Sequence, residues 1–293
     1  MTITVRVPGS CGELLQGQAD EIPFLVTCPI DQYTTVTVHP QEEQSHYPLG
    51  EKAMQAIRVT CDYLRVPVPS GAFSLASDLP WGKGMASSSA DILAMCHAVA
   101  TVCGRRLSEE EAFRLALKME PTDAVGCRGI VLADHIGGLR LERFGAPPAM
   151  RIAVFDYGGT IDTVAFNARR DLTLLNRKKQ ARIAEALFYL RKGLLTKNPA
   201  FIGKGATISA MANQSILYKE GLADVIQIAK EEGSVGVNVA HSGTVLGVLF
   251  KADACKQYER CILRVERAVT GLDFYTDASL IAGGVEIGGD KDE

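Results

Sequence analysis

The stretch WGKGMASSSAD, residues 81–91, places two glycines and three consecutive serines directly before a run of helix-forming apolar residues. The first backbone N–H groups of a helix have no partner within it, and the helix dipole makes that end electropositive. Glycines allow an anion to approach such an end closely. The stretch is therefore typical of a phosphate-binding loop. The alternative is an ordinary glycine turn in which Ser87 caps the helix.

Two common phosphate-binding motifs do not fit this stretch. A P-loop requires G-x-x-x-x-G-K-[ST], but Lys83 is followed by Gly84. The dinucleotide-binding fingerprint requires a third glycine where this chain has Ser87, and no strand-like run directly precedes it. The sequence therefore argues against both a P-loop core and a Rossmann core.

The bulk composition narrows the class of protein. The 293 residues suggest one large or two medium domains, and 47% hydrophobic with 22% charged residues is typical of a soluble globular protein. A net charge of −3 gives no electrostatic argument for nucleic-acid binding. No apolar run approaches the ~18 residues of a membrane span, and no signal-peptide core is evident. We expect a cytoplasmic protein without nucleic-acid or membrane partners, and the sequence does not indicate its oligomeric state.

The eight cysteines are scattered and form no C-x-x-C pair. Zinc sites usually show such pairs or closely spaced His and Cys, and here only Cys96 and His97 are adjacent. Neighbouring helical residues point about 100° apart, which suits two ligands of one ion poorly. We therefore predict free thiols, mostly in the core, in a reducing compartment.

The pattern along the chain predicts an α+β protein, with strands in alternating or β-branched runs and helices in amphipathic runs. Strands are expected at 2–9, 33–40, 72–80 and 151–157, a hairpin at 236–250, helices at 50–64, 87–104, 107–121, 176–195 and 255–272, and a weak strand after the last helix. The charges of the helix at 176–195 are interpreted as a solvated face.

The helix at 107–121 has signals at both ends. Ser108 and Glu111 have the spacing of a capping box, and Pro121 ends the helix. This arrangement brings two carboxylates, Glu120 and Asp123, to its C-terminal end.

Three glycine-bearing segments, taken together and in this order, resemble the GHMP kinases (galactokinase, homoserine kinase, mevalonate kinase and phosphomevalonate kinase). They are VPGSCGELLQG at 7–17, LPWGKGMASSSA at 79–90 and AHSGTVLGVLF at 240–250. The second resembles the phosphate loop P-x-G-x-G-L-G-S-S-A of that family, with Met85 for Leu and Ala86 for the third Gly. The resemblance implies a two-domain GHMP kinase fold with a ribosomal S5-like domain at 1–150, its phosphate loop at 80–90, and a ferredoxin-like domain at 151–293.

Within that superfamily the detail is similar to the L-threonine kinase branch, which serves cobalamin synthesis. The similarity rests on SCGELLQG at 10–17, CPIDQYTTVTV at 28–38, EPTDAVGCRGI at 120–130 and AHSGTVLG at 240–247. It implies an ATP- and Mg²⁺-dependent enzyme that phosphorylates the hydroxyl of L-threonine. Two alternatives stay open: a homoserine or isoprenoid-precursor kinase, and a nucleotide-binding sensor without catalysis.

The resemblance also implies roles for individual residues. Ser88 and Glu120 are expected to hold Mg²⁺, Lys83 to serve as a point charge for phosphate, and Asp123 to accept the hydroxyl proton. The expected nucleotide-binding residues are Pro80, Trp81, Gly82, Lys83, Gly84, Met85, Ala86, Ser87, Ser88, Ser89 and Ala90. The expected acceptor-binding residues are Ser10, Cys11, Gly12, Glu13, Asp31, Ser242 and Gly243.

Each assignment has a plainer alternative. At least one serine of the loop is expected to cap the helix, and Glu120 and Asp123 can also be read as surface carboxylates. The carboxylates Glu13, Asp31 and Asp156 either hold the amino group of the substrate or stabilise turns. His241 is expected to be a hydrogen-bonded structural residue.

One position departs from the mevalonate-kinase-like pattern. Those members carry, after the PG of the first motif, a lysine that assists the catalytic aspartate, whereas this chain has Ser10. Either Asp123 acts as a base unaided, or the hydroxyl proton passes late and directly to the phosphate.

Overall fold

The computed structural model describes residues 2–41 and 49–289 and has an α+β fold. The described strands are β1 (Ile3–Ala19), β2 (Ile22–His39), β3 (Ala72–Ser77), β4 (Ile130–Ala133), β5 (Leu141–Gly145), β6 (Met150–Asp156), β7 (Gly236–Val239), β8 (Val245–Lys251), β9 (Asp273–Leu280) and β10 (Glu286–Gly289). The described helices are α1 (Glu51–Leu64), α2 (Ser87–Val102), α3 (Glu109–Leu117), α4 (Thr163–Asn167), α5 (Leu172–Leu195), α6 (Pro199–Asn213), α7 (Leu222–Glu231) and α8 (Lys256–Ala268).

The strands form one sheet in the order β10-β1-β7-β8-β6-β9-β2-β4-β5, with β3 attached to β2. All the pairings between these described strands are antiparallel. A Rossmann core requires parallel strands joined by crossovers. The topology therefore confirms the expectation that this is not a doubly wound nucleotide-binding fold.

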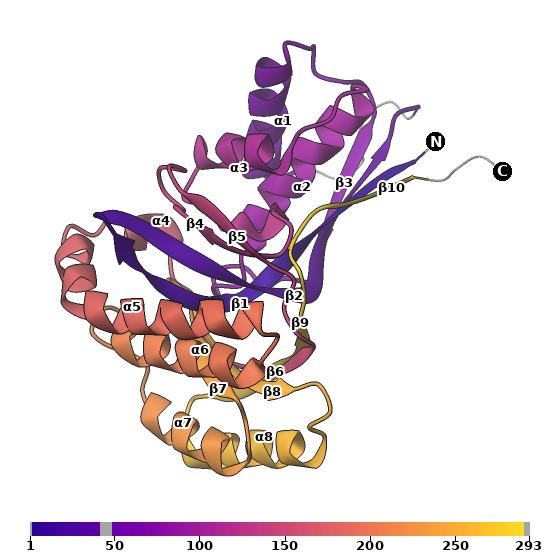
Figure 1. Cartoon of the computed structure of the whole chain (residues 1–293). Coiled ribbons are helices and arrows are strands. Elements are labelled where there is room, and N and C mark those ends of the chain that lie inside the picture. Colours follow the sequence, from indigo (N-terminus) through magenta and orange to yellow (C-terminus); the bar gives the residue numbers. More distant parts are fainter. Residues whose placement is uncertain (1, 42–48, 290–293) are drawn as a thin grey trace.

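A long hairpin of β1 and β2 runs through the middle of the molecule (Figure 1). The sequence predicts strands only at 2–9 and 33–40, but both strands continue far beyond these limits. The strand β1 passes Pro8 and Gly12 because its register with β2 shifts between Pro8 and Ser10, and again on either side of Glu13. Such bulges let a strand bend and re-aim its residues without ending. The segment 10–17 is thus a bulged strand.

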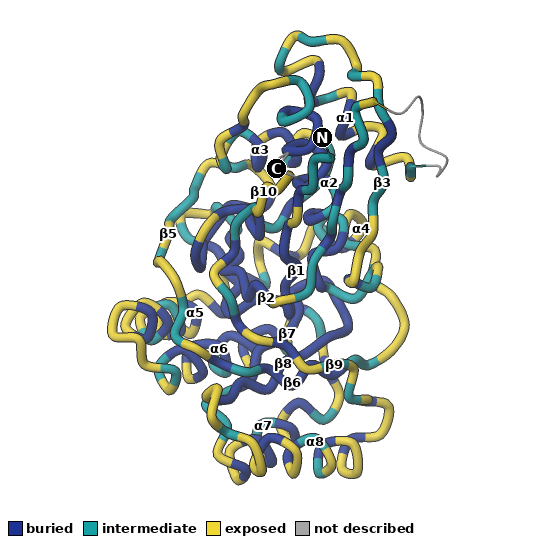
Figure 2. The backbone as a smooth tube through the Cα atoms, turned by 90° about the vertical axis from the view of Figure 1, so that its right-hand side faces the viewer, coloured by how far each residue is buried: buried dark blue, intermediate teal, exposed yellow. Residues whose placement is uncertain are grey.

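Helices cover the sheet at both ends of the molecule. In Figure 1, α1, α2 and α3 lie at one end of the long hairpin, α5 and α6 lie along its other part, and α7 and α8 lie beyond β6 to β8. The helix α2 contacts both β1 and β2 and is buried almost all round. Figure 2 shows the buried backbone concentrated along the central strands, with exposed segments on α7 and α8.

The basic helix expected at 176–195 forms most of α5. Several of its charges are exposed as expected, but Lys179 is buried with only 4% of its surface exposed. Its Nζ donates a 3.0 Å hydrogen bond to Oδ1 of Asn213 on α6. The interpretation of the charged residues as a solvated face therefore holds for only some of them, because Lys179 is buried.

The C-terminal strands return to the first half of the chain. The strand β9 pairs with β6 and also meets β2 at Ile30, and β10 pairs with β1. The expected boundary at residue 150 falls at the first residue of β6, Met150.

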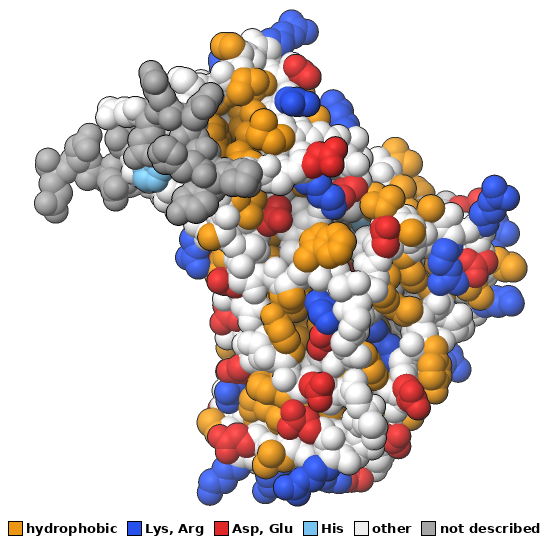
Figure 3. Space-filling view, turned by 180° about the vertical axis from the view of Figure 1, so that it is seen from behind, with side chains coloured by type: hydrophobic (Ala, Val, Ile, Leu, Met, Phe, Trp, Pro, Cys, Tyr) orange, Lys and Arg blue, Asp and Glu red, His pale blue; other side chains and the backbone are white. Residues whose placement is uncertain are grey.

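The described surface is mixed in charge over most of the face in Figure 3, where acidic and basic side chains are interspersed. Among residues 2–41 and 49–289, no helix is both long and apolar enough to span a membrane.

Candidate active site

A cavity of about 90 Å³ lies beside the glycine–serine loop, where six separate parts of the chain meet. Of the residues expected to take part in binding or catalysis, twelve line it: Glu13, Trp81, Gly82, Gly84, Met85, Ala86, Ser87, Ser88, Ser89, Glu120, Asp123 and Ser242. The lining also includes Lys52, Pro121 and the segment 161–164, which sequence reasoning did not assign. The three motif segments, far apart in sequence, therefore reach one site.

The loop before α2 has a backbone that suits an anion. Gly82 and Gly84 have φ of 73° and 83°, the left-handed region that favours glycine. Ala86 also has a positive φ, 57°, and is the N-cap of α2, which has no side-chain capping bond. The expectation that a loop serine caps the helix is therefore wrong, because the backbone turns at Ala86 and the serines lie in the first turn.

Backbone contacts from the other two glycine motifs hold this loop in place. The N–H groups of Ser10 and Gly12 donate to the carbonyls of Met85 and Gly84, at 3.0 and 3.1 Å. The N–H of Thr244 donates to the carbonyl of Lys83 at 2.8 Å. The first and third motifs therefore act partly as scaffolding for the second.

Some predicted acceptor-binding residues belong to this scaffold and do not line the cavity. Gly12 and Gly243 pack directly against backbone, and the Ser10 hydroxyl donates to the carbonyls of Gly12 and Cys28. Cys11 is fully buried in the core. Asp31 is exposed, and its carboxylate accepts a 2.7 Å hydrogen bond from the N–H of Ser279. None of these five residues lines the cavity, and for Asp31 the structure favours the alternative role of stabilising local backbone.

Lys83 turns away from the cavity. Its Nζ lies 2.6 Å from Oδ2 of Asp156, and the hydroxyl of Thr244 donates to Oδ1 of the same carboxylate at 2.5 Å. Burial raises the pKa of Asp156, but the hydrogen bonds from Lys83, Thr244 and the Gly158 backbone, together with the charge of Lys83, hold the pKa below its ordinary value. Lys83 is therefore paired with a carboxylate in this structure, and neither it nor Pro80 or Ala90 lines the cavity.

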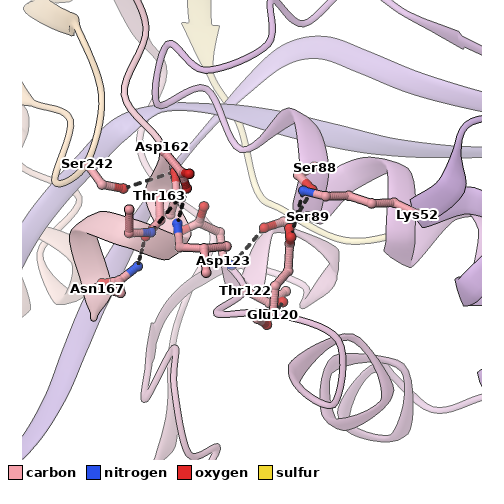
Figure 4. Close-up of polar contacts among 12 residues, drawn as sticks. Lys52, Ser88, Ser89, Glu120, Thr122, Asp123, Asp162, Thr163, Asn167 and Ser242 are labelled. Atoms are coloured by element: carbon pink, nitrogen blue, oxygen red, sulfur yellow. Dashed lines mark hydrogen bonds and ion pairs between the residues drawn. The ribbon is translucent and has the colours of Figure 1, made fainter. Parts of the chain in front are cut away.

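Ser88 and Glu120 meet at the side of the cavity. The Ser88 hydroxyl donates to Oε1 of Glu120, and Nζ of Lys52 lies 2.8 Å from Oγ of Ser88 and 2.6 Å from Oε2 of Glu120 (Figure 4). A hydroxyl and a carboxylate are oxygen ligands of the kind that Mg²⁺ prefers together with phosphate and water. Within residues 2–41 and 49–289, no group of three or more His, Cys, Asp or Glu side chains is placed so that it could hold a metal ion by itself. The donor set thus fits Mg²⁺ that arrives with phosphate oxygens.

Asp123 lies deeper, after Pro121 at the end of the α3 segment. Its N–H donates a 3.0 Å hydrogen bond to Oγ of Ser89, which fixes this loop against α2. Burial, and then the negative charge of Glu120, raise the pKa of Asp123. A carboxyl with a raised pKa is better matched to accept a proton near neutral pH.

Glu13 is a second buried carboxyl at the cavity. Its Oε2 accepts a 2.5 Å hydrogen bond from the N–H of His241. Burial raises the pKa of Glu13 well above its usual range, and the charge of Asp123 raises it further, while Lys219 and Lys179 lower it. Two neighbouring carboxyls resist being charged at the same time, so Glu13 and Asp123 together tend to keep one proton between them.

The lysines near Glu13 come from distant parts of the chain. Burial lowers the pKa of Lys179 to about 7 and that of Lys219 to about 8, although the charge of Glu13 partly opposes both shifts. Lys219 donates a 2.7 Å hydrogen bond to the carbonyl of Gly243, beside the phosphate loop. Nothing in the local sequence distinguishes them from ordinary surface lysines.

His241 has the structural role expected from the sequence. Its Nδ1 lies 3.0 Å from Oε1 of Gln16 and its Nε2 lies 3.3 Å from Oδ1 of Asn167. Each ring nitrogen thus has an amide oxygen within hydrogen-bond reach, and the neutral ring donates to one of them. Burial also lowers the pKa of this ring well below its usual range.

Asp162 and Thr163 are cavity residues that sequence reasoning missed. The Asp162 carboxylate accepts from the N–H groups of Val164 and Ala165 and so caps α4. The Thr163 hydroxyl lies 3.4 Å from Oγ of Ser242. The sequence signal that could have identified Asp162 is an Asp in capping position before a short apolar run. For Lys52, in the first turn of α1, the sequence contains no comparable signal.

Comparisons with known proteins identify relatives of this chain. The model of the GHMP kinases N-terminal domain matches residues 51–131. An L-threonine kinase of Salmonella typhimurium is 32% identical over 84% of this chain and 82% of its own length. A galactokinase of Mycobacterium tuberculosis is 34% identical over 77% of this chain and 67% of its own. The crystal structure of a homoserine kinase from Cytophaga hutchinsonii superposes with a TM-score of 0.69 at 16% identity, covering 98% and 97% of the two chains.

Proposed function

This chain belongs to the GHMP kinase family, and we propose that it transfers the γ-phosphoryl group of ATP to the hydroxyl of L-threonine. The products are ADP and O-phospho-L-threonine, and the proposed use of the latter is the aminopropanol linker of cobalamin. The similarity to an L-threonine kinase over most of both chains supports this acceptor. The observation that carries the proposal is the convergence of the phosphate loop, Glu120 and Asp123 on one cavity.

The loop and the start of α2 are proposed to hold the β- and γ-phosphates. The N–H groups of Ser87, Ser88 and Ser89 lie in the first turn, where a helix offers unpaired donors and a positive dipole end. Ser88 and Glu120 would hold Mg²⁺, which when bound neutralises charge on the phosphates. Phosphoryl transfer depends mainly on such positioning and charge stabilisation, because its transition state is loose.

Asp123 is proposed to accept the proton of the threonine hydroxyl. The hydroxyl oxygen forms a bond to the γ-phosphorus as the bond from phosphorus to the bridging oxygen of ADP breaks, and the hydroxyl proton passes to Asp123. The raised pKa of Asp123 supports this role. Direct transfer of the proton to the phosphate remains the alternative.

Glu13 and Ser242 are the proposed acceptor-binding side chains, since both line the cavity. Asp162 adds a carboxylate at the same cavity. An ammonium group placed near Glu13 would relieve the repulsion between Glu13 and Asp123. An amino-acid acceptor therefore suits the cavity electrostatically.

Domains at 1–150 and 151–293 remain our proposed division, with the cavity between segments of both. We also propose a cytoplasmic location, supported by the eight free thiols, of which six are buried.

The proposal is tested by measuring ADP release from MgATP with L-threonine, L-serine, L-homoserine, mevalonate and galactose as acceptors, and by mass spectrometry of the product. We expect the highest kcat/KM with L-threonine and a product heavier by one phosphoryl group. A preference for homoserine, mevalonate or galactose would refute L-threonine as the acceptor, while the proposed kinase activity would stand. ATP binding without turnover on any acceptor would favour a nucleotide-binding sensor.

A further inference from the structure

Lys52 occupies the position that a metal ion would take between Ser88 and Glu120. Its Nζ lies 2.8 Å from the Ser88 oxygen and 2.6 Å from Oε2 of Glu120, and all three side chains line the cavity (Figure 4). Mg²⁺ binds oxygen ligands at about 2.0–2.1 Å. An ion bound to the same two groups would therefore lie within a few ångströms of the ammonium, and the two positive charges would repel strongly.

We infer that Lys52 is an internal counter-ion, which neutralises the metal ligands in the nucleotide-free protein and which the metal–nucleotide complex displaces. This inference rests on the proposed assignment of Ser88 and Glu120 as the metal ligands.

The burial of the partners supports an exchange of this kind. The Glu120 side chain is only 11% exposed, whereas that of Lys52 is 46% exposed. A carboxylate that is largely buried requires a compensating charge or hydrogen bonds. The lysine is long and half in solvent, so its ammonium can leave while the carboxylate stays in place.

The surrounding charges explain why a counter-ion is needed at rest. Burial is the main cause of the raised pKa of both Asp123 and Asp91, and the negative charge of Glu120 raises both further. The positive charge of Lys52 opposes the shift at Asp91. Without Lys52, the negative charge of Glu120 would act on Asp123 and Asp91 without the positive charge that is paired with Glu120 in this structure.

The displaced ammonium would remain at the cavity wall beside the incoming phosphates. Lys52 would thus exchange a carboxylate partner for a phosphate partner, because a lysine acts as a mobile point charge for phosphate. The consequence is that free divalent ions bind the resting site poorly and that metal and nucleotide enter together.

The test measures Mn²⁺ binding to the nucleotide-free protein, from the electron paramagnetic resonance signal of free Mn²⁺. Lys52→Gln should bind Mn²⁺ at least about tenfold more tightly than the wild type, because a repelling charge at contact distance is removed. Lys52→Arg keeps the charge and should resemble the wild type. Lys118→Gln is the matched control, since it also removes a positive charge but lies near the ring of Tyr63. Thermal unfolding of each variant verifies that it is folded.

Two further measurements separate this inference from the proposed function. Glu120→Gln should weaken Mn²⁺ binding in the presence of a non-hydrolysable ATP analogue, and in combination with Lys52→Gln it should abolish the tenfold gain. Equal Mn²⁺ affinity of Lys52→Gln and wild type, with Glu120→Gln still weakening the ternary complex, overturns the role of Lys52 alone. If Glu120→Gln leaves Mn²⁺ binding in the ternary complex unchanged, Glu120 is not a metal ligand. That result refutes the proposed metal site and the role of Lys52 with it.

Discussion

Gly243→Ala tests whether the third glycine motif positions the phosphate loop. Gly243 is buried, and its φ lies outside the left-handed region, so alanine is compatible with the local backbone. A Cβ at this position, however, would lie 2.3 Å from Cα of Gly84 and 2.3 Å from the carbonyl oxygen of Lys83. Both contacts are to backbone atoms, which cannot rotate away as the end of a side chain can.

The size of the effect follows from these distances. Ordinary van der Waals contact begins at 3.4 Å, so the loop and the third motif must separate by about 1 Å. A displacement of about 1 Å in a catalytic arrangement can cost roughly a hundredfold in rate, or about 2.7 kcal/mol of transition-state stabilisation. We therefore expect kcat/KM for ATP to fall by about two orders of magnitude.

The assay is steady-state ADP formation with the best acceptor of the screen, together with thermal unfolding to show that the variant is folded. Gly288→Ala is the control, because a Cβ there meets nothing within 4 Å and the residue lies in the exposed strand β10. The control should retain wild-type kinetics. A folded Gly243→Ala with unchanged kcat/KM would refute the argument that this contact holds the loop in place.

Three further substitutions test the roles proposed for the cavity. Ser88→Ala should lower turnover by about a hundredfold, whereas Ser70→Ala at an exposed position should not; ADP formation measures both. Glu120→Gln should raise the Mg²⁺ concentration needed for half-maximal rate, seen in a Mg²⁺ titration, because an amide supplies no charge to the ion. Asp123→Asn should keep ATP binding but slow phosphorylation by about 10²-fold or more. Because the pKa of Asp123 is raised, its carboxylate takes up a proton at a higher pH than an ordinary aspartate does. As the pH is lowered, wild-type kcat/KM should therefore begin to fall before the usual aspartate range is reached. Glu120→Gln removes one cause of the raised pKa, so in this variant the fall should occur at lower pH.

The elements with strong local signals could be predicted from the sequence. The helix expected at 87–104 is α2, and the capping box of Ser108 and Glu111 is present with both of its hydrogen bonds. The hairpin expected at 236–250 is β7 and β8. In each case the local pattern of residues places the element correctly, although the cap of α2 is Ala86 and not a serine.

Two of the features that were missed depend on contacts between distant parts of the chain. All four residues of β10 are exposed, so Glu286–Gly289 carries no alternation of buried and exposed side chains and becomes a strand only by pairing with β1. The continuation of β1 past Gly12 likewise requires bulges opposite β2. Neither feature leaves a pattern in the local sequence.

The candidate site shows the same division. Backbone motifs with characteristic glycines identified the loop, and the capped helix identified Glu120 and Asp123 as neighbours. The direction of a side chain was not predictable: Lys83 belongs to the loop but points to Asp156, whereas Lys52 lies outside every motif and reaches Glu120. A lysine has a long, flexible stem, so its position in the sequence does not fix where its charge lies.

The same reasoning applies to the lysine that mevalonate-kinase-like members carry where this chain has Ser10. The Ser10 hydroxyl is bonded to the carbonyls of Gly12 and Cys28, so this position supplies no charge to the carboxyls of the cavity. Lys179 and Lys219 instead bring positive charge to Glu13 from α5 and from the segment between α6 and α7. Lys219 also holds the Gly243 carbonyl, so this charge is tied to the motif that packs on the phosphate loop. The first strand can therefore lack a lysine while the cavity keeps cationic neighbours, because the second half of the chain provides them.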